Sequence, residues 1–109
     1  MKDKYKVVLV TTEGCEGCRI QKNLLDKVYE DYIGSYEYTT IDKDKIRETF
    51  ASIRTNTEEP LVISDFPATI FIIDNWVFRT CIGTRTKETL KQYVEEMLQT
   101  GGVYHKVSK

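Results

Sequence analysis

The feature that most constrains this chain is a pair of cysteines, Cys15 and Cys18, placed where a strand pattern gives way to a helix pattern. The preceding segment, residues 5–11, is apolar and rich in β-branched side chains over the length of a strand. After the cysteines, apolar residues recur every four positions, which marks one face of a helix: Ile20, Leu24, Val28 and Tyr32. Both sulfurs are therefore expected in the first turn of a helix.

This placement has a chemical consequence. The first turn of a helix has free backbone N–H groups and the positive end of the helix dipole, and both favour a thiolate. A cysteine there has a pKa below its reference value of about 8.5, and the thiolate is the reactive nucleophile. With two residues between them, Cys15 and Cys18 are also close enough to form a disulfide that is made and broken repeatedly.

The first half of the chain predicts a βαβ unit. A strand at residues 5–11 is followed by a helix from about Cys15 to Tyr32, which ends near Gly34, and by a strand at residues 36–42. Strands joined in this way are parallel, with a right-handed crossover. A second helix is expected from Lys43 to Asn56.

The second half predicts a hairpin and a last helix. Residues 65–73 form a proline-led strand, Asp74-Asn75 a two-residue turn, and residues 76–82 the returning strand. The last helix is expected from Lys87 to about Gln99, ended by Gly101-Gly102, with residues 103–109 as a loose tail. The order β-α-β-α-β-β-α predicts an α/β fold: a four-stranded mixed sheet with helices on both faces.

Size and composition narrow the function classes. The chain has 109 residues and 40% hydrophobic content, enough for a modest core in one domain, with a core at about residues 4–100. The net charge of -1 predicts no nucleic-acid partner. No apolar run approaches the ~20 residues of a membrane span, and no signal-type segment precedes the first strand, so the expected location is the cytoplasm. There a CxxC pair is more often catalytic or metal-binding than structural.

Three other interpretations of the cysteines remain open. A zinc site needs four ligands, for which the chain offers only Cys81 and its sole histidine, His105, in addition to Cys15 and Cys18. An iron–sulfur cluster shared by two chains is the second, and a pair of inert thiols is the third. We expect no metal, because Cys81 falls in the hairpin strand as a small apolar residue and His105 in the tail.

The sequence resembles the thioredoxin superfamily at three places. These are Cys15-Glu16-Gly17-Cys18 after the first strand, Phe66-Pro67 before the third strand, and Gly83 between the hairpin and the last helix. The resemblance covers about residues 4–100 and implies a thioredoxin-like fold with a redox-active disulfide. It also implies a cis bond before Pro67, next to the cysteines.

The same resemblance implies where a substrate docks. The backbone of Phe66, just before the cis-proline, pairs with an extended substrate segment, as a short β-addition. Ile82, Gly83 and Thr84 match the loop that completes the apolar docking surface around the two cysteines.

Several residues depart from typical thioredoxins. Gly14 stands where they carry tryptophan, and Leu9 where they bury an aspartate that accepts the proton of the resolving thiol. Glu16-Gly17 replaces the usual Gly-Pro. Only fourteen residues precede Cys15, a layout similar to that of glutaredoxins, but their glycine pair after the hairpin is absent.

We therefore expect a thioredoxin-like protein-disulfide reductase that serves cell redox homeostasis. Cys15 is the nucleophile and Cys18 the resolving thiol, with no cofactor beyond their disulfide. The expected partners are disulfide-containing proteins and an electron donor such as a thioredoxin reductase, and the expected state is a monomer. Two alternatives remain: a non-catalytic binding module with this fold, and a glutathione-linked, glutaredoxin-like reductase.

The residues around the cysteines predict a reducing potential. The Glu16 carboxylate disfavours a thiolate at Cys15, Arg19 offsets this in part, and Gly17 carries no charge. We expect a potential of about -270 mV or lower, because oxidising members of this class depend on a strongly stabilised thiolate. Equilibrium titration against glutathione measures it, and a value of about -180 to -210 mV contradicts the expectation.

Overall fold

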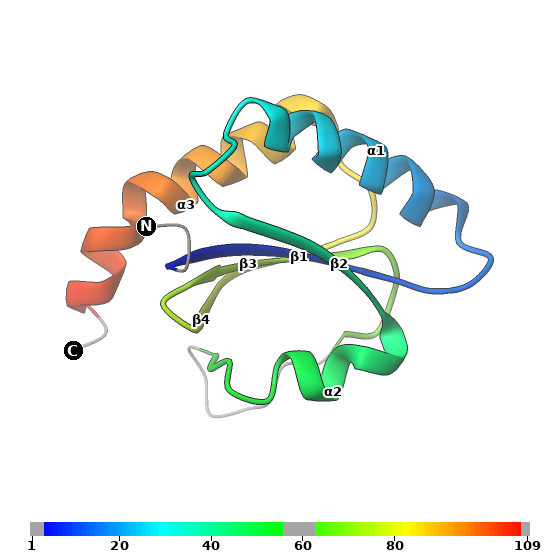
Figure 1. The fold of residues 1–109 in the computed structure, drawn as a ribbon, viewed down its shortest axis with the longest axis horizontal. Helices are drawn as coiled ribbons and strands as arrows, with labels where there is room; N and C mark the ends of the chain where they lie inside the picture. The colour runs from blue at the N-terminus through cyan, green and yellow to red at the C-terminus, as the bar shows by residue number, and fades with distance from the viewer. Residues whose placement is uncertain (1–3, 56–62, 108–109) are drawn as a thin grey trace.

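A four-stranded mixed sheet runs through the middle of the protein, in the order β2-β1-β3-β4 (Figure 1). The computed structural model describes residues 4–55 and 63–107, with side chains as far as residue 100. The elements in chain order are β1 (Tyr5–Thr11), α1 (Glu16–Glu30), β2 (Glu37–Asp42), the 3-10 turn η1 (Lys43–Lys45), α2 (Ile46–Thr49), β3 (Ala68–Ile73), β4 (Trp76–Ile82) and α3 (Lys87–Val107). The predicted α/β class and four-stranded mixed sheet are confirmed.

Strand β1 lies at the centre of the sheet. It pairs in parallel with β2, in register Val8 to Thr39, and antiparallel with β3, in register Val8 to Ile70. Strands β3 and β4 form a hairpin whose two turn residues, Asp74 and Asn75, have φ angles of 51° and 67°. Positive φ at both turn positions is typical of the tight turn that matches the twist of a hairpin, and it suits Asp and Asn.

Helices cover both faces of the sheet, as predicted. Helices α1 and α3 lie together on one face, and η1 and α2 on the other (Figure 1). Because side chains alternate along a strand, Val7 and Leu9 of β1 point into the core under α1 and α3, and Val8 and Val10 into the core on the opposite face. All four side chains are buried. This two-sided burial explains why β1 has an unbroken apolar sequence.

The tyrosines around the first crossover are packing residues. The Tyr29 ring lies edge-on to Tyr36, with 5.2 Å between ring centroids, and contacts Tyr38 at 5.6 Å. The hydroxyl of Tyr32 donates to Glu95 Oε2 at 2.7 Å, which links the end of α1 to α3. These contacts join α1, β2 and α3 at the end of α1 remote from the cysteines.

The second helix is much shorter than predicted. Residues 43–56 were expected to be helical, but only η1 and the four residues of α2 are helical, and Asn56 lies outside the described part of the chain. After α2 the chain forms a bridge to β4: the Arg54 N–H donates to Asn75 O, and the Val77 N–H donates to Arg54 O, both at 2.7 Å. Pairing with the sheet thus replaces helical hydrogen bonds. The apolar face of this segment still packs on the sheet, through Ile46, Phe50 and Ile53.

Three element ends also differ from the sequence prediction. Helix α3 continues to Val107, so the prediction that Gly101-Gly102 ends it, with a loose tail from residue 103, is wrong. Glycine costs a helix about 1 kcal/mol per residue, which lowers its stability without forbidding it. Strand β3 begins at Ala68, directly after Pro67, and β2 at Glu37. No helix of residues 4–55 or 63–107 is long and apolar enough to span a membrane.

The packing of α1 on the sheet gives a stability prediction. Leu25 is 1% exposed in the core between α1 and the sheet. Leu25→Ala is expected to lower the free energy of unfolding by about 2–5 kcal/mol, because it removes buried methyl groups and leaves a cavity. Urea denaturation of the oxidised protein measures this. Ile33→Ala is the control: Ile33 is 71% exposed, and a change above about 0.5 kcal/mol there would contradict the account.

Candidate functional site

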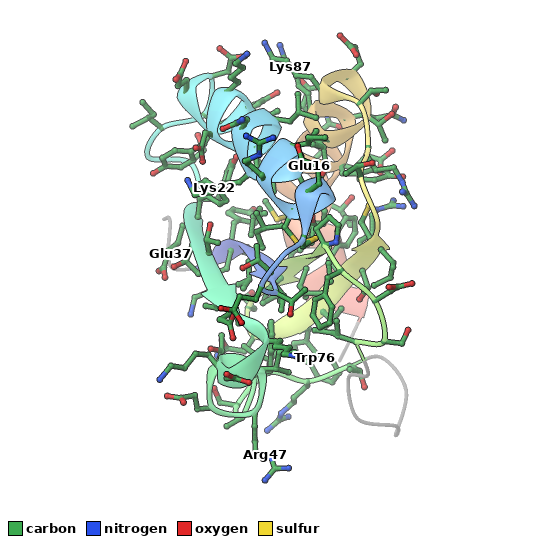
Figure 2. All side chains as sticks on the ribbon, turned by 90° about the vertical axis from the view of Figure 1, so that its right-hand side faces the viewer. Glu16, Lys22, Glu37, Arg47, Trp76 and Lys87 are labelled. Carbon is green, nitrogen blue, oxygen red and sulfur yellow. A yellow bond between two sulfur atoms is a disulfide. The ribbon has the colours of Figure 1, made fainter. Side chains whose placement is uncertain are left out.

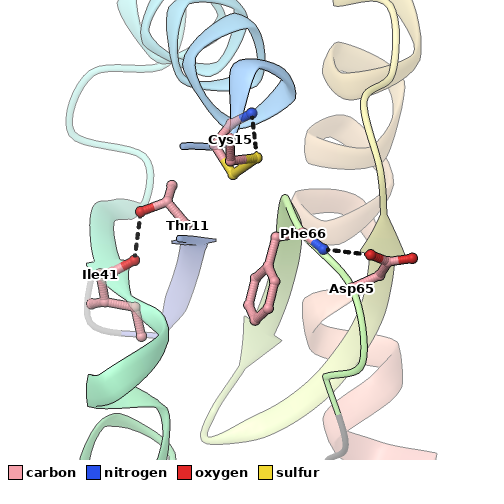
Figure 3. Close-up of a disulfide and its surroundings, with 6 residues drawn as sticks. Thr11, Cys15, Ile41, Asp65 and Phe66 are labelled. Atoms are coloured by element: carbon pink, nitrogen blue, oxygen red, sulfur yellow. Dashed lines mark hydrogen bonds between the residues drawn. A yellow bond between two sulfur atoms is a disulfide. The ribbon is translucent and has the colours of Figure 1, made fainter. Parts of the chain in front are cut away.

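Cys15 and Cys18 form a disulfide at the start of α1 (Figure 3). The chain leaves β1 at Thr11, whose hydroxyl donates to Ile41 O of β2 at 3.2 Å, and turns at Gly14, which has a φ of +69°. Cys15 then caps α1 with extended backbone, and Cys18 lies in the first turn. The placement predicted from the sequence is confirmed for both residues.

The two sulfurs have different surroundings. The backbone N–H of Cys18 donates to Cys15 Sγ at 3.0 Å, and Cys15 is partly exposed. Cys18 is only 4% exposed. An N–H donor and the positive end of the helix dipole both favour a negative charge on Cys15 when the disulfide is open. The geometry makes Cys15 the accessible sulfur and Cys18 the enclosed one.

Two segments distant in sequence lie against this first turn. The bond between Phe66 and Pro67 is cis, the arrangement that the resemblance implies for Pro67. A Cβ built on Gly17 would lie 3.3 Å from Pro67 Cδ and 3.4 Å from Thr84 Cγ2. The distance to Pro67 is tighter than most Cβ contacts, so a side chain at position 17 would displace the Pro67 segment by a few tenths of an ångström, whereas the distance to Thr84 is close to ordinary van der Waals contact. The Gly83 N–H donates to Pro67 O at 2.7 Å and joins the two outer segments.

The docking residues implied by the resemblance are thus gathered near the disulfide, but not all face solvent. Thr84 is exposed, and Gly83 adopts a φ of +89° at the end of β4. Phe66 and Ile82 are partly buried and pack against the core on the α2 face of the sheet. The Phe66 N–H donates to Asp65 Oδ1 at 3.3 Å, so this loop is held by its own carboxylate (Figure 3).

A buried glutamine next to the cysteines was missed by the sequence analysis. Gln21 lies one turn after Cys18 and is 0% exposed. Its Nε2 donates to Thr69 Oγ1 of β3 at 3.0 Å, and its Oε1 accepts from the Arg85 N–H at 3.1 Å. The predicted apolar face of this helix ran through Ile20, Leu24, Val28 and Tyr32, but Ile20 is 46% exposed and the buried residues of α1 are Cys18, Gln21, Leu25 and Val28. The buried face is therefore rotated relative to the prediction, and the sequence pattern contained no signal for Gln21.

Charges around the disulfide are exposed and partly paired. Glu16 lies on the outer surface at the start of α1 (Figure 2) and forms an ion pair with Arg19. Both side chains are exposed, so solvent screens the pair and it contributes little to stability. A polar hollow also adjoins the loop before Cys15, lined by Thr12, Glu13, Asp42, Lys43 and Asp44. A substrate that approaches from this side meets a polar surface with more carboxylates than cations.

The metal alternative finds no ligand set in the described part of the chain. No group of three or more His, Cys, Asp or Glu side chains there is arranged to hold an ion. Cys81 lies in the core under α1 and α3, paired in register with Thr69, and the His105 side chain lies outside the described residues.

Comparison with known proteins adds no family assignment. No protein-family model matches the chain, and no curated protein sequence matches it significantly. The geometry of the site is therefore the basis for any assignment of function.

The surroundings of Cys81 give a reactivity prediction. Burial raises the pKa of the Cys81 thiol, and Arg85 and Arg79 lower it by a smaller amount. With the Cys15–Cys18 disulfide closed, Cys81 is expected to react with Ellman's reagent at least about tenfold more slowly in the folded than in the unfolded protein, because burial lowers both its thiolate fraction and its access. The folded rate rises with pH through the raised pKa.

The measurement is the thiol titration of oxidised protein with and without denaturant. The Cys81→Ala variant is the control, since it removes the slow signal and reveals any reduced Cys15 or Cys18. Equal rates in the folded and unfolded protein would contradict the buried position.

Proposed function

We propose that this protein is a thiol–disulfide oxidoreductase of the thioredoxin type, which reduces disulfides in other proteins. The observation that carries the proposal is the asymmetric Cys15–Cys18 pair at the start of α1. One sulfur is partly exposed and bonded to a backbone N–H, and the other is 4% exposed one turn further in. The nearby cis bond before Pro67 and the loop at Gly83 support the same assignment.

The first step is attack on the substrate. With both cysteines reduced, the Cys15 thiolate attacks one sulfur of a substrate disulfide in line with the S–S bond. A bond forms between Cys15 Sγ and that sulfur, the substrate S–S bond breaks, and the other substrate sulfur leaves as a thiolate that takes a proton from water. The Cys18 N–H and the start of α1 lower the energy of the attacking thiolate.

The second step releases the substrate. Cys18 loses its proton and attacks Cys15 Sγ, so the mixed disulfide breaks and the second substrate sulfur leaves as a thiol. Two electrons have then passed to the substrate, and the Cys15–Cys18 disulfide has formed. Leu9, 0% exposed, stands where thioredoxins bury the carboxylate that accepts the Cys18 proton, so water or the leaving thiolate takes it in this chain. A dithiol donor such as a thioredoxin reductase restores the reduced form.

The substrate segment docks beside Pro67. An extended chain adds to the backbone of Phe66 as a short strand, which aligns its disulfide with Cys15. The Phe66 N–H must then exchange its 3.3 Å bond with Asp65 for one with the substrate. Asp65 is exposed and Phe66 is partly exposed, so a substrate segment can approach this hydrogen bond from solvent. We place the protein in a reducing compartment such as the cytoplasm, acting as a monomer.

Insulin reduction with dithiothreitol as electron donor tests the proposal. We expect the wild-type protein to accelerate the reaction at least about tenfold over dithiothreitol alone, since a positioned thiolate reacts faster than a free dithiol. Cys15→Ser abolishes the acceleration. Cys18→Ser stops after the first step: when it is reduced, freed of dithiothreitol and then mixed with insulin, it accumulates a covalent complex, seen as a mixed disulfide on a non-reducing gel.

Other outcomes assign other functions. No acceleration above free dithiol, with insulin bound but not reduced, indicates a binding module. Reduction of glutathione mixed disulfides that survives Cys18→Ser indicates glutathione-linked chemistry, which needs only the first cysteine.

A further inference from the structure

We propose that Gln21 is a positioning residue that holds residues 83–85 against α1 and thereby determines how well a protein substrate docks beside the disulfide. This inference rests on the proposed function and adds a residue to it. Gln21 sets the position of the docking loop relative to the cysteines. It takes no part in the bond-breaking steps, which involve only Cys15 and Cys18.

The two ends of the Gln21 amide join three segments. From α1, the Nε2 group reaches Thr69, two residues after Pro67, at 3.0 Å, and the Oε1 atom accepts from the backbone N–H of Arg85 at 3.1 Å. The partners lie 48 and 64 residues away in the chain. One side chain thus ties the cysteine helix both to the strand that begins at the cis-proline and to the loop that follows β4.

The bond to Arg85 stabilises the exposed part of the docking loop. Gly83 is already joined to Pro67 by its own N–H, at 2.7 Å. Thr84, which follows, is exposed and lies near the first turn of α1, where a Cβ on Gly17 would be 3.4 Å from Thr84 Cγ2. With Gly83 bonded on one side and Arg85 on the other, Thr84 is held in place next to the disulfide. The loop is also held by Thr86, which accepts from the Thr89 and Leu90 N–H groups at the start of α3, but those bonds fix it to α3. The Gln21 bond is the one that ties the Arg85 backbone to α1.

A neutral amide suits this position. Gln21 is 0% exposed, so an unpaired donor or acceptor there would be costly, and both ends of its amide are bonded. A carboxylate in its place would put a buried negative charge one turn from Cys18 and oppose a thiolate there. The amide holds the loop without changing the charge near the sulfurs.

The test compares a protein substrate with a small one. Pre-reduced protein is mixed with excess insulin or bis(2-hydroxyethyl) disulfide, and the loss of its thiols is followed in a single turnover. For Gln21→Met, which keeps the volume and removes both bonds, we expect the insulin concentration at half-maximal rate to rise about tenfold, the effect of one lost buried hydrogen bond. The limiting rate, and the rate with the small disulfide, stay within about twofold because neither depends on the loop.

Two variants control for folding and for chemistry. Gln92→Met makes the same substitution at an exposed site of α3 and is expected to leave both reactions unchanged. Gln21→Glu keeps the shape and both bonds, because the Thr69 hydroxyl can donate to a carboxylate, so it restores the insulin concentration at half-maximal rate. Any slowing by its buried charge near Cys18 falls equally on insulin and on the small disulfide. Equal losses with insulin and the small disulfide in Gln21→Met, or no loss with either, overturn the proposal.

Hydrogen exchange separates this inference from the proposed function. The Arg85 amide is expected to exchange about tenfold faster in Gln21→Met than in the wild type, since its acceptor is gone. If the wild-type protein reacts with no disulfide, the proposed function fails. Faster exchange at Arg85 then still supports the loop-holding role of Gln21, and unchanged exchange overturns it.

Discussion

The candidate site depends on the close approach of the first turn of α1 to two segments that are distant in the sequence. These are the segment at Pro67, just before β3, and the loop at Gly83 and Thr84, just after β4. A Cβ at position 17 would lie 3.3 Å from Pro67 Cδ and 3.4 Å from Thr84 Cγ2, so a side chain there would displace the Pro67 segment by a few tenths of an ångström. The Gly83 N–H bond to Pro67 O joins the two segments to each other. Because the three segments meet at the Cys15–Cys18 disulfide, a shift in any of them changes the surface around the two sulfurs.

The start of α1 gives the two cysteines different surroundings. Cys15 is the N-cap, outside the regular turn, where its sulfur accepts a backbone N–H and remains partly exposed. Cys18 is buried because the helix turns it toward the sheet. A spacing of three residues thus leaves the Cys15 sulfur partly exposed at the start of the helix and the Cys18 sulfur buried against the sheet. Gln21, a further three residues along, then lies on the buried side as well, which is why it can reach β3 and the loop after β4.

The α/β class and the four-stranded mixed sheet could be predicted from the sequence, whereas the ends of α2 and α3 could not. Strand β1, the tight turn at Asp74 and Asn75, and the helix after Cys15 were predicted because each rests on a local pattern within a few residues. The helix expected over residues 43–56 was largely wrong, because Arg54 pairs with the residues around Trp76, a partner that local propensity does not include. The end of α3 was wrong because glycine weakens a helix without stopping it.

For the site, local sequence patterns were enough to predict the two cysteines, their place at a strand-to-helix junction, and the proline and glycine of the segments beside them. These features depend on residue types and on spacings of a few residues, and local backbone preferences are enough to determine the structure of such short segments. The place of Cys15 nearer the helix start also predicted that it is the more exposed sulfur. The approach of Gly17 to Pro67 and the bonds of Gln21 to Thr69 and Arg85 appear only in the folded chain. The two Gln21 bonds join residues 48 and 64 positions apart, and such pairs become neighbours only once the order of the strands in the sheet is set.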